Sequence, residues 1–417
     1  MRPPLRYDRA RGFTLVELMV ALTGGLFVAV AVFSLAREGT TFHQRESRLA
    51  TATFSGLVGF QRLRLDLARA GFLSSPNVRS DPSVCGYAPA TWADGLLEQL
   101  TSLKVVDGGS ATNPTLTANN LAPDRVVLAG SFASGEQFPI TTVEVSGTTY
   151  RVYLQPNSGP IARAGISSNE TLQAVFGTDR GMRIIDRTGR THFGIISTAV
   201  WSATAPYVVL KDSIPLTFRA SGTTCGLHVN EVGALANVVN FIRYDVRPIA
   251  ATAAYDQLDD AYAVVPGFDT DRTELVRGEL TATSTVDSAA IAGTEELVAE
   301  YTVDLDLGLT VVDTLGTSGV DPVLTHLRCT NGVGCEAGTS LSFGDFGGTS
   351  ATPATQRVRG VRARLAVRTR APDRPGPHDD GTRLYRVALG AAGAGPYARV
   401  RTFQADVALR NHSGVTW

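Results

Sequence analysis

The chain begins with a short polar segment, which is followed by a long run of almost wholly apolar side chains. The run extends from residue 13 to residue 36, and the carboxylate of Glu17 is the one charge within it. As a helix, a run of this length measures about 36 Å, which is enough to cross the hydrocarbon core of a bilayer. We therefore predict a membrane-spanning helix over residues 13–36.

The apolar pattern continues past the span with helical spacing. Residues 37–72 contain no proline, and at 100° per residue they form two apolar stripes. The wider stripe contains Phe42, Leu49, Leu57, Phe60, Leu63 and Leu67, and the narrower one contains Phe54, Val58, Leu65 and Phe72. We predict an amphipathic continuation of the helix over residues 37–72 that stops at Gly71. The second stripe is explained either by neighbouring helices or by one domain that buries both sides.

From residue 73 onward the pattern changes to short apolar runs separated by turn residues. The segments that fit strands are 126–128, 142–145, 150–154, 183–185, 193–196, 207–210, 238–246, 296–304, 358–368 and 399–411. This order predicts an α+β protein, in which the long N-terminal helix packs on a large antiparallel β-sheet domain over residues 73–417. The domain has room for two sheets, and the acidic, turn-rich composition suggests a subdivision near residues 250–275.

The segment before the span carries positive charge. Arg2, Arg6, Arg9 and Arg11 precede it, so residues 1–12 should stay in the cytoplasm and the C-terminal domain should be exported. Without residues 1–12 the chain would keep a small negative charge, which argues against a general nucleic-acid-binding surface. We expect a membrane protein with a single span and a C-terminal domain on the side away from the cytoplasm.

Glu17 is the costly residue of the span. A carboxylate at the centre of a membrane helix costs roughly 2.5–3.5 kcal/mol, and such residues are functional candidates by default. The order of basic segment, Gly12, Phe13-Thr14-Leu15 and then Glu17 resembles a type IV prepilin signal. The resemblance implies that residues 1–12 are a leader peptide, that prepilin peptidase cuts after Gly12, and that Phe13 becomes N-methylated. The cut would supply an α-amine as partner for Glu17. The alternative is an ordinary anchor that tolerates the carboxylate.

The four cysteines are Cys85, Cys225, Cys329 and Cys335. An even number in an exported chain favours disulfides over free thiols, and four cysteines allow three connectivities. Because Cys329 and Cys335 flank a short turn-rich loop, local pairing is preferred, and that leaves Cys85 for Cys225. Metal binding is the less favoured alternative, since no Cys-x-x-Cys spacing is present.

Few residues suggest chemistry. The sequence contains no His-Glu-x-x-His, no Gly-x-Ser-x-Gly and no phosphate-binding loop, so we expect no enzymatic activity and no cofactor. Asp269, Asp271 and Glu274 could bind calcium, but they lack the full loop pattern, and a solvated acidic turn is preferred.

Three further segments extend the resemblance. They are the helix end at residues 61–72, the Val-Arg-x-Val-Arg strand at 358–368, and the last strand, which ends in Ala408-Leu409-Arg410-Asn411. Together with the signal they resemble the PilW-type minor pilins of type IV pili. The resemblance is close over residues 1–72 and loose over parts of 238–411, and residues 75–235 match no family pattern. The aspartate-rich turn of that family is weakened here to residues 304–308.

The resemblance implies a minor pilin that takes part in type IV pilus assembly, in a priming, tip or base complex. Its partners would be prepilin peptidase, the inner membrane and other minor and major pilins, which it contacts through the N-terminal helix. A type II secretion minor pseudopilin is the first alternative, because the N-terminal signal is common to both systems. An adhesive or binding module is the second alternative, and it would use residues 75–235.

Overall fold

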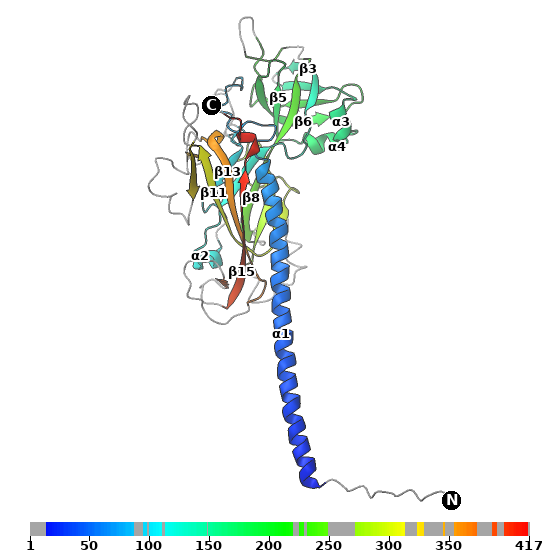
Figure 1. Ribbon diagram of the computed structural model, residues 1–417. Helices are drawn as coiled ribbons and strands as arrows, with labels where there is room; N and C mark the ends of the chain where they lie inside the picture. Colours follow the sequence, from blue (N-terminus) through cyan, green and yellow to red (C-terminus); the bar gives the residue numbers. More distant parts are fainter. Residues whose placement is uncertain are drawn as a thin grey trace, which may run out of the picture. The chain divides into compact units, whose positions relative to one another are not determined.

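The computed structural model describes residues 14–86, 95–97, 100–110, 113–147, 149–219, 225–228, 232–248, 272–312, 323–328, 345–346, 354–372, 386–389 and 396–415 (Figure 1). The chain forms two compact units, Met1–Thr51 and Ala52–Trp417. Each unit is considered by itself below.

One continuous helix, α1 (Leu15–Ala68), contains 54 residues and belongs to both units. It joins the predicted span and its predicted continuation without a break. The helix ends in tight turns, in which the amide of Arg69 donates to the Asp66 carbonyl and the amide of Ala70 donates to the Leu67 carbonyl. Gly71 then adopts a φ of +74°, a left-handed conformation that suits glycine and ends the helix near the predicted residue.

The second unit is built on two antiparallel sheets and three short α-helices among its described residues, with two 3₁₀ helices at Thr355–Arg357 and Arg410–His412. The larger sheet consists of β1 (Leu103–Val106), β2 (Arg125–Gly130), β3 (Phe138–Ser146), β4 (Thr149–Leu154), β5 (Gly181–Ile185), β6 (Thr191–Val200), β7 (Tyr207–Leu210), β8 (Leu235–Pro248), β9 (Thr273–Leu280) and β10 (Glu296–Ala299). The smaller sheet has the order β12 (Leu324–Arg328), β11 (Thr302–Val312), β13 (Val358–Arg368), β15 (Tyr397–Ala408) and β14 (Arg386–Ala388). The helices are α2 (Pro114–Ala118), α3 (Gly159–Arg163) and α4 (Asn169–Val175).

Part of the larger sheet closes on itself. The order β8-β3-β4-β7-β6-β5 returns to β8, because the first residues of β8 pair with β3 on one edge and with β5 on the other. Strand β8 continues beyond this six-stranded barrel and pairs there with β2 and β9. The barrel has its own apolar core, to which α3 and α4 contribute Ile161, Leu172 and Val175. Figure 1 shows these two helices beside the strands of the barrel.

A second core lies where the last turns of α1, the open part of the larger sheet and the smaller sheet meet. Phe60, Leu63 and Leu67 of α1 pack there against side chains of β1, β2, β8, β11 and β13. Glycines let α1 approach the strands closely. A Cβ atom built on Gly59 would lie 2.6 Å from the Val298 carbonyl oxygen, and one on Gly56 would lie 2.5 Å from the Phe403 ring. Larger residues at these positions would push the helix off the sheet.

The α+β arrangement with two antiparallel sheets agrees with the sequence-based prediction. The predicted strand at 296–304 is interrupted, because Tyr301 adopts a φ of +53° between β10 and β11. The chain passes from the larger to the smaller sheet at this turn. The subdivision suggested near 250–275 falls mostly on residues 249–271, which lie outside the described residues. Strands β8 and β9 on either side of that segment pair with each other in one sheet.

Candidate functional site

The start of α1 is organised by Thr14 and Glu17. The Glu17 carboxylate oxygen Oε2 accepts hydrogen bonds from the Thr14 amide at 3.0 Å and from the Thr14 hydroxyl at 2.9 Å. In return, the Glu17 amide donates to Thr14 Oγ1 at 3.2 Å. This reciprocal pair is a capping box, which satisfies backbone amides that have no partner inside the helix. This role of Glu17 was not predicted from the sequence, although the Thr-x-x-Glu spacing is its usual signal.

Gly12 and Phe13, the two residues of the expected cleavage site, lie outside the described residues. An α-amine on Phe13 would be covalently adjacent to Thr14, the residue that already holds the Glu17 carboxylate. Glu17 therefore lies at the start of the helix, where its carboxylate caps the first turn.

The first unit presents apolar side chains around its helix. Leu15, Phe27, Phe33 and Leu35 are each more than two-thirds exposed. The segment is long and apolar enough to cross a membrane, which agrees with the expected single span near the N-terminus. A continuous apolar surface of this kind marks a region that is covered by lipid or by other helices.

Within the second unit, α1 has one covered face and one exposed face. Phe60, Leu63 and Leu67 of the wider stripe are buried, with exposed fractions of 4%, 0% and 0%. Of the narrower stripe, Phe54 and Leu65 are 71% and 62% exposed. The described part of the domain therefore covers one stripe and leaves the other open, whereas the sequence left both arrangements possible. Leu57 and Phe42, which the sequence placed on the wider stripe, are 44% and 65% exposed.

A buried ionic cluster fixes the covered face of α1. The carboxylate of Asp66 accepts hydrogen bonds from the Tyr244 hydroxyl and from Nε of Arg277, both at 2.8 Å. Tyr244 lies on β8 and Arg277 on β9, so one helix residue is bonded to two neighbouring strands. Burial raises the pKa of Tyr244, which therefore stays protonated and remains a donor. The predicted helix end at 61–72 contains Asp66, but nothing in the sequence identified its partners.

The C-terminal segment contacts the end of α1. The Asn411 side-chain amide donates to the Ala70 carbonyl at 2.9 Å. The neighbouring His412 is fully buried, with Nδ1 3.0 Å from the Val358 carbonyl oxygen and Nε2 2.5 Å from the Ser102 hydroxyl. Since the carbonyl can only accept, Nδ1 donates to it and Nε2 accepts from Ser102. Burial lowers the pKa of His412 to about 4, so the ring is neutral at physiological pH.

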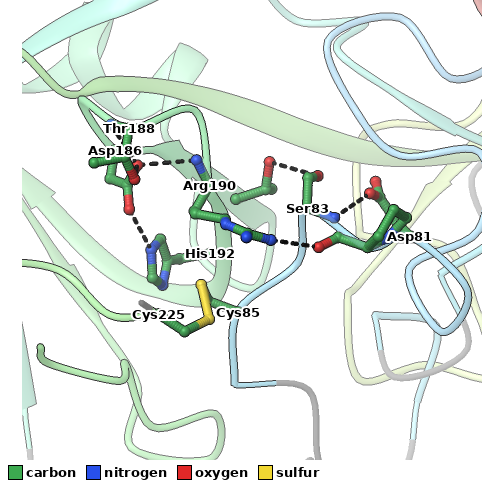
Figure 2. The surroundings of a disulfide bond; sticks show 10 residues. Asp81, Ser83, Cys85, Asp186, Thr188, Arg190, His192 and Cys225 are labelled. Atoms are coloured by element: carbon green, nitrogen blue, oxygen red, sulfur yellow. Dashed lines mark hydrogen bonds and ion pairs between the residues drawn. A yellow bond between two sulfur atoms is a disulfide. The ribbon is translucent and has the colours of Figure 1, made fainter. Parts of the chain in front are cut away.

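A disulfide connects Cys85 to Cys225 across 140 residues, with a Cα–Cα distance of 5.5 Å. This is the long-range pairing favoured in the sequence analysis, while Cys329 and Cys335 lie outside the described residues. The segment that carries Cys85 is also bonded to β6, where the Cys85 amide donates to the Thr191 carbonyl at 2.8 Å. Figure 2 shows the disulfide beside His192 and the Asp186 turn. The bond thus ties the chain after α1 to the loop that precedes β8.

The candidate calcium residues do not form a described site. Asp269 and Asp271 lie outside the described residues, and Glu274 is fully buried on β9. Its carboxylate is bonded to Arg272 and accepts the Tyr301 amide at 2.8 Å. Burial raises the pKa of Glu274 to about 7.

The aspartate turn that the sequence placed at residues 304–308 is also occupied by an ion pair. Its acids, Asp304 and Asp306, both bind Arg364. In the described part of the chain no cluster of His, Cys, Asp and Glu could hold a metal ion.

Comparison with known proteins does not assign the chain to a family. The chain matches no protein-family model, no curated protein and no solved structure. The candidate site is therefore defined by its own geometry: a capped, apolar helix start with Glu17, and an apolar stripe that stays exposed where α1 packs on its domain.

Proposed function

We propose that the chain is a minor pilin of the PilW type. In this proposal it waits in the inner membrane, prepilin peptidase removes residues 1–12, and the mature subunit joins the priming, tip or base complex of a type IV pilus. Its work is assembly and not catalysis. Helix α1 would pack among the helices of other subunits, while the sheets face outward.

The observation that carries the proposal is the start of α1. A basic segment, Gly12, Phe13 and the Thr14–Glu17 capping box precede an uninterrupted apolar helix. The cap alone could be completed by an uncharged glutamine, whereas the carboxylate adds a considerable cost in lipid. The exposed stripe at Phe54, Val58 and Leu65 adds support, because it offers other helices an apolar surface that the described part of the domain does not cover.

In this mechanism Glu17 has two tasks. Within its own helix it caps the first turn through Thr14. In the filament its charge neutralises the terminal amine of a neighbouring subunit. In a dry environment that pair matters mainly because a lone charge there is strongly penalised.

Two substitutions separate the two tasks. Glu17→Gln keeps a side chain that can complete the capping box but removes the charge, whereas Glu17→Ala removes both. We expect both variants to enter the membrane and to lose residues 1–12, and both to fail in assembly. Normal piliation with Glu17→Gln would exclude the charge-pairing role and leave only the cap.

Processing is tested directly by intact-mass and N-terminal analysis in cells with and without prepilin peptidase. The proposal expects a mature chain that begins at a methylated Phe13 only when the peptidase is present. A chain that begins at Met1 in both strains would overturn it.

The alternative assembly is a type II secretion pseudopilus, which would use the same signal and helix. Deletion of the gene distinguishes the two systems. Loss of surface pili with secretion intact supports the pilus, and the reverse result supports the pseudopilus.

A further inference from the structure

The outer surface of the barrel carries a second, independent feature. On β4 the side chains of Val152 and Leu154 are buried in the barrel core, and on β7 those of Val208 and Leu210 are buried there. Side chains alternate between the two faces of a strand. The intervening residues of β4 and β7 therefore point away from the core, and a pair of tyrosines lies among them.

Tyr153 and Tyr207 are direct cross-strand neighbours on this surface. Their ring centroids are 5.3 Å apart and the rings are inclined by 46°. In the same row, Thr142 on β3 is paired with Tyr153, and Val200 on β6 is paired with Tyr207. The two rings thus form the centre of a strip of side chains that crosses four strands of the barrel.

Both rings are held in position by polar neighbours. The Tyr153 hydroxyl donates to the Glu144 carboxylate at 2.9 Å. The guanidinium of Arg151 lies 5.7 Å from the centroid of the Tyr207 ring. Because these contacts exist before any ligand arrives, little ordering of side chains would be needed on binding.

The charges on this strip compensate each other. Glu144 on β3 lies directly opposite Arg151 on β4, and both side chains are exposed. A strip that binds nucleic acid needs more cations than anions, because it must neutralise phosphates. Here Arg151 is balanced by Glu144, so these residues provide no excess of positive charge. The strip's recognition groups are the partly exposed rings of Tyr153 and Tyr207, one carboxylate, one guanidinium and a threonine hydroxyl.

We propose that the Tyr153–Tyr207 strip binds a neutral oligosaccharide. The C–H groups of a pyranose face are weakly positive and pack on the negative face of an aromatic ring. The sugar hydroxyls can donate to Glu144 and accept from Arg151, which gives orientation without a need for net charge. The proposal is independent of pilus assembly, and it would give the lobe formed by residues 138–238 a surface-binding role.

The test uses the full-length protein in lauryldimethylamine oxide micelles, because this detergent has no sugar headgroup. The probes are cellotetraose, chitotetraose, maltotetraose and mannotetraose, with single-stranded DNA as a charged comparison. Saturation-transfer NMR detects binding and calorimetry measures affinity. Tyr153→Ala and Tyr207→Ala remove the rings, and Tyr153→Phe keeps the ring without its hydroxyl. Tyr397→Ala, on the smaller sheet, is the matched control.

We expect at least one tetrasaccharide to bind, with each alanine substitution in the strip weakening binding about tenfold. Tyr153→Phe should weaken it less, and Tyr397→Ala should leave it unchanged. Unaltered far-ultraviolet circular dichroism would show that the alanine variants remain folded. The proposal is overturned if none of the tetrasaccharides binds, if binding is insensitive to Tyr207→Ala, or if DNA alone binds at the strip.

Discussion

Asp66 on α1 and Arg277 on β9 form a buried ion pair, with Oδ2 and Nε 2.8 Å apart and side chains only 4% and 14% exposed. The same carboxylate also binds the Tyr244 hydroxyl. The cluster joins the helix to the sheet by directional bonds in the middle of an apolar contact. It therefore sets the position of α1 along and around its axis, which apolar packing alone would leave loosely defined.

Removal of this carboxylate should destabilise the second unit strongly. Asp66→Ala removes the buried partner of Arg277 and leaves it only the half-exposed Glu296, 3.6 Å from its Nη1. A broken buried pair typically costs about 3–5 kcal/mol. Arg62→Gln is the control, because Arg62 is 46% exposed and its nitrogen lies 4.0 Å from the same carboxylate. Its effect should stay within about 0.5 kcal/mol. Chemical denaturation of both variants measures the difference, and equal effects would contradict the assigned role of Asp66.

The two stripes of α1 should respond to substitution in opposite ways. Leu63 is fully buried, so Leu63→Ala should cost about 2–5 kcal/mol of unfolding free energy. Phe54 is 71% exposed, so Phe54→Ser should change stability little. If the exposed stripe contacts other subunits, Phe54→Ser should nevertheless reduce incorporation into filaments. Denaturation and immunodetection in sheared pili measure the two effects. Normal incorporation would remove Phe54 from the proposed contact.

The approach of α1 to the strands should depend on glycine. Gly59→Ala adds a Cβ atom that would lie only 2.6 Å from the Val298 carbonyl oxygen and 2.7 Å from the Ala299 methyl group. Overpacking of this kind costs roughly 1–3 kcal/mol. Gly39→Ala is the matched control on the same helix, since no atom lies within 4 Å of its added methyl. That substitution should be neutral or stabilising, by up to about 1 kcal/mol. Thermal unfolding in micelles distinguishes the two.

His412 should make stability depend on pH in the acid range. Its pKa in the folded protein is about 4, below the ordinary value of about 6.5. The unfolded chain therefore binds more protons between these values. The contribution of His412 to stability is fully present above pH 6.5 and is lost as the pH falls toward 4, at up to about 1.4 kcal/mol per pH unit.

The comparison that isolates this effect is His412→Asn, which keeps a donor and an acceptor without titrating. Its unfolding free energy relative to the wild type should improve steadily from pH 6.5 to pH 4. The buried acids Asp124 and Glu274, with pKa values raised to about 8 and about 7 by burial, act in the opposite direction. They are present in both proteins and cancel in the difference. A constant difference across this range would contradict the neutral state of His412.

The sequence predicted the elements whose pattern is local. The apolar run and its helical stripes predicted α1. Period-two alternation predicted β13 with the bounds that the structure has, Val358–Arg368. The turn residues between 146 and 149 gave the β3–β4 hairpin. In each case the signal lies within about ten residues, which is the range over which periodicity determines structure.

Relationships between distant segments could not be read in the same way. Nothing around Leu235 shows that β8 pairs with β3 and β5 in one half and with β2 and β9 in the other. The partners of Asp66 and His412 are likewise far away in the chain, so their burial was not evident. The capping box at Thr14 and Glu17 has a local sequence signal and could have been predicted. An α-amine partner was predicted for Glu17 instead, because a carboxylate is costly in lipid.

The continuity of β8 has a mechanical consequence. This strand of 14 residues belongs to the barrel at its start and to the open sheet beside α1 at its end. A pull on the barrel along β8 would load the hydrogen bonds to β2 and β9 together, in shear, and would not open them one after another. Because no flexible linker lies between Leu235 and Pro248, the barrel would transmit tension to the helix-bearing sheet as a stiff arm.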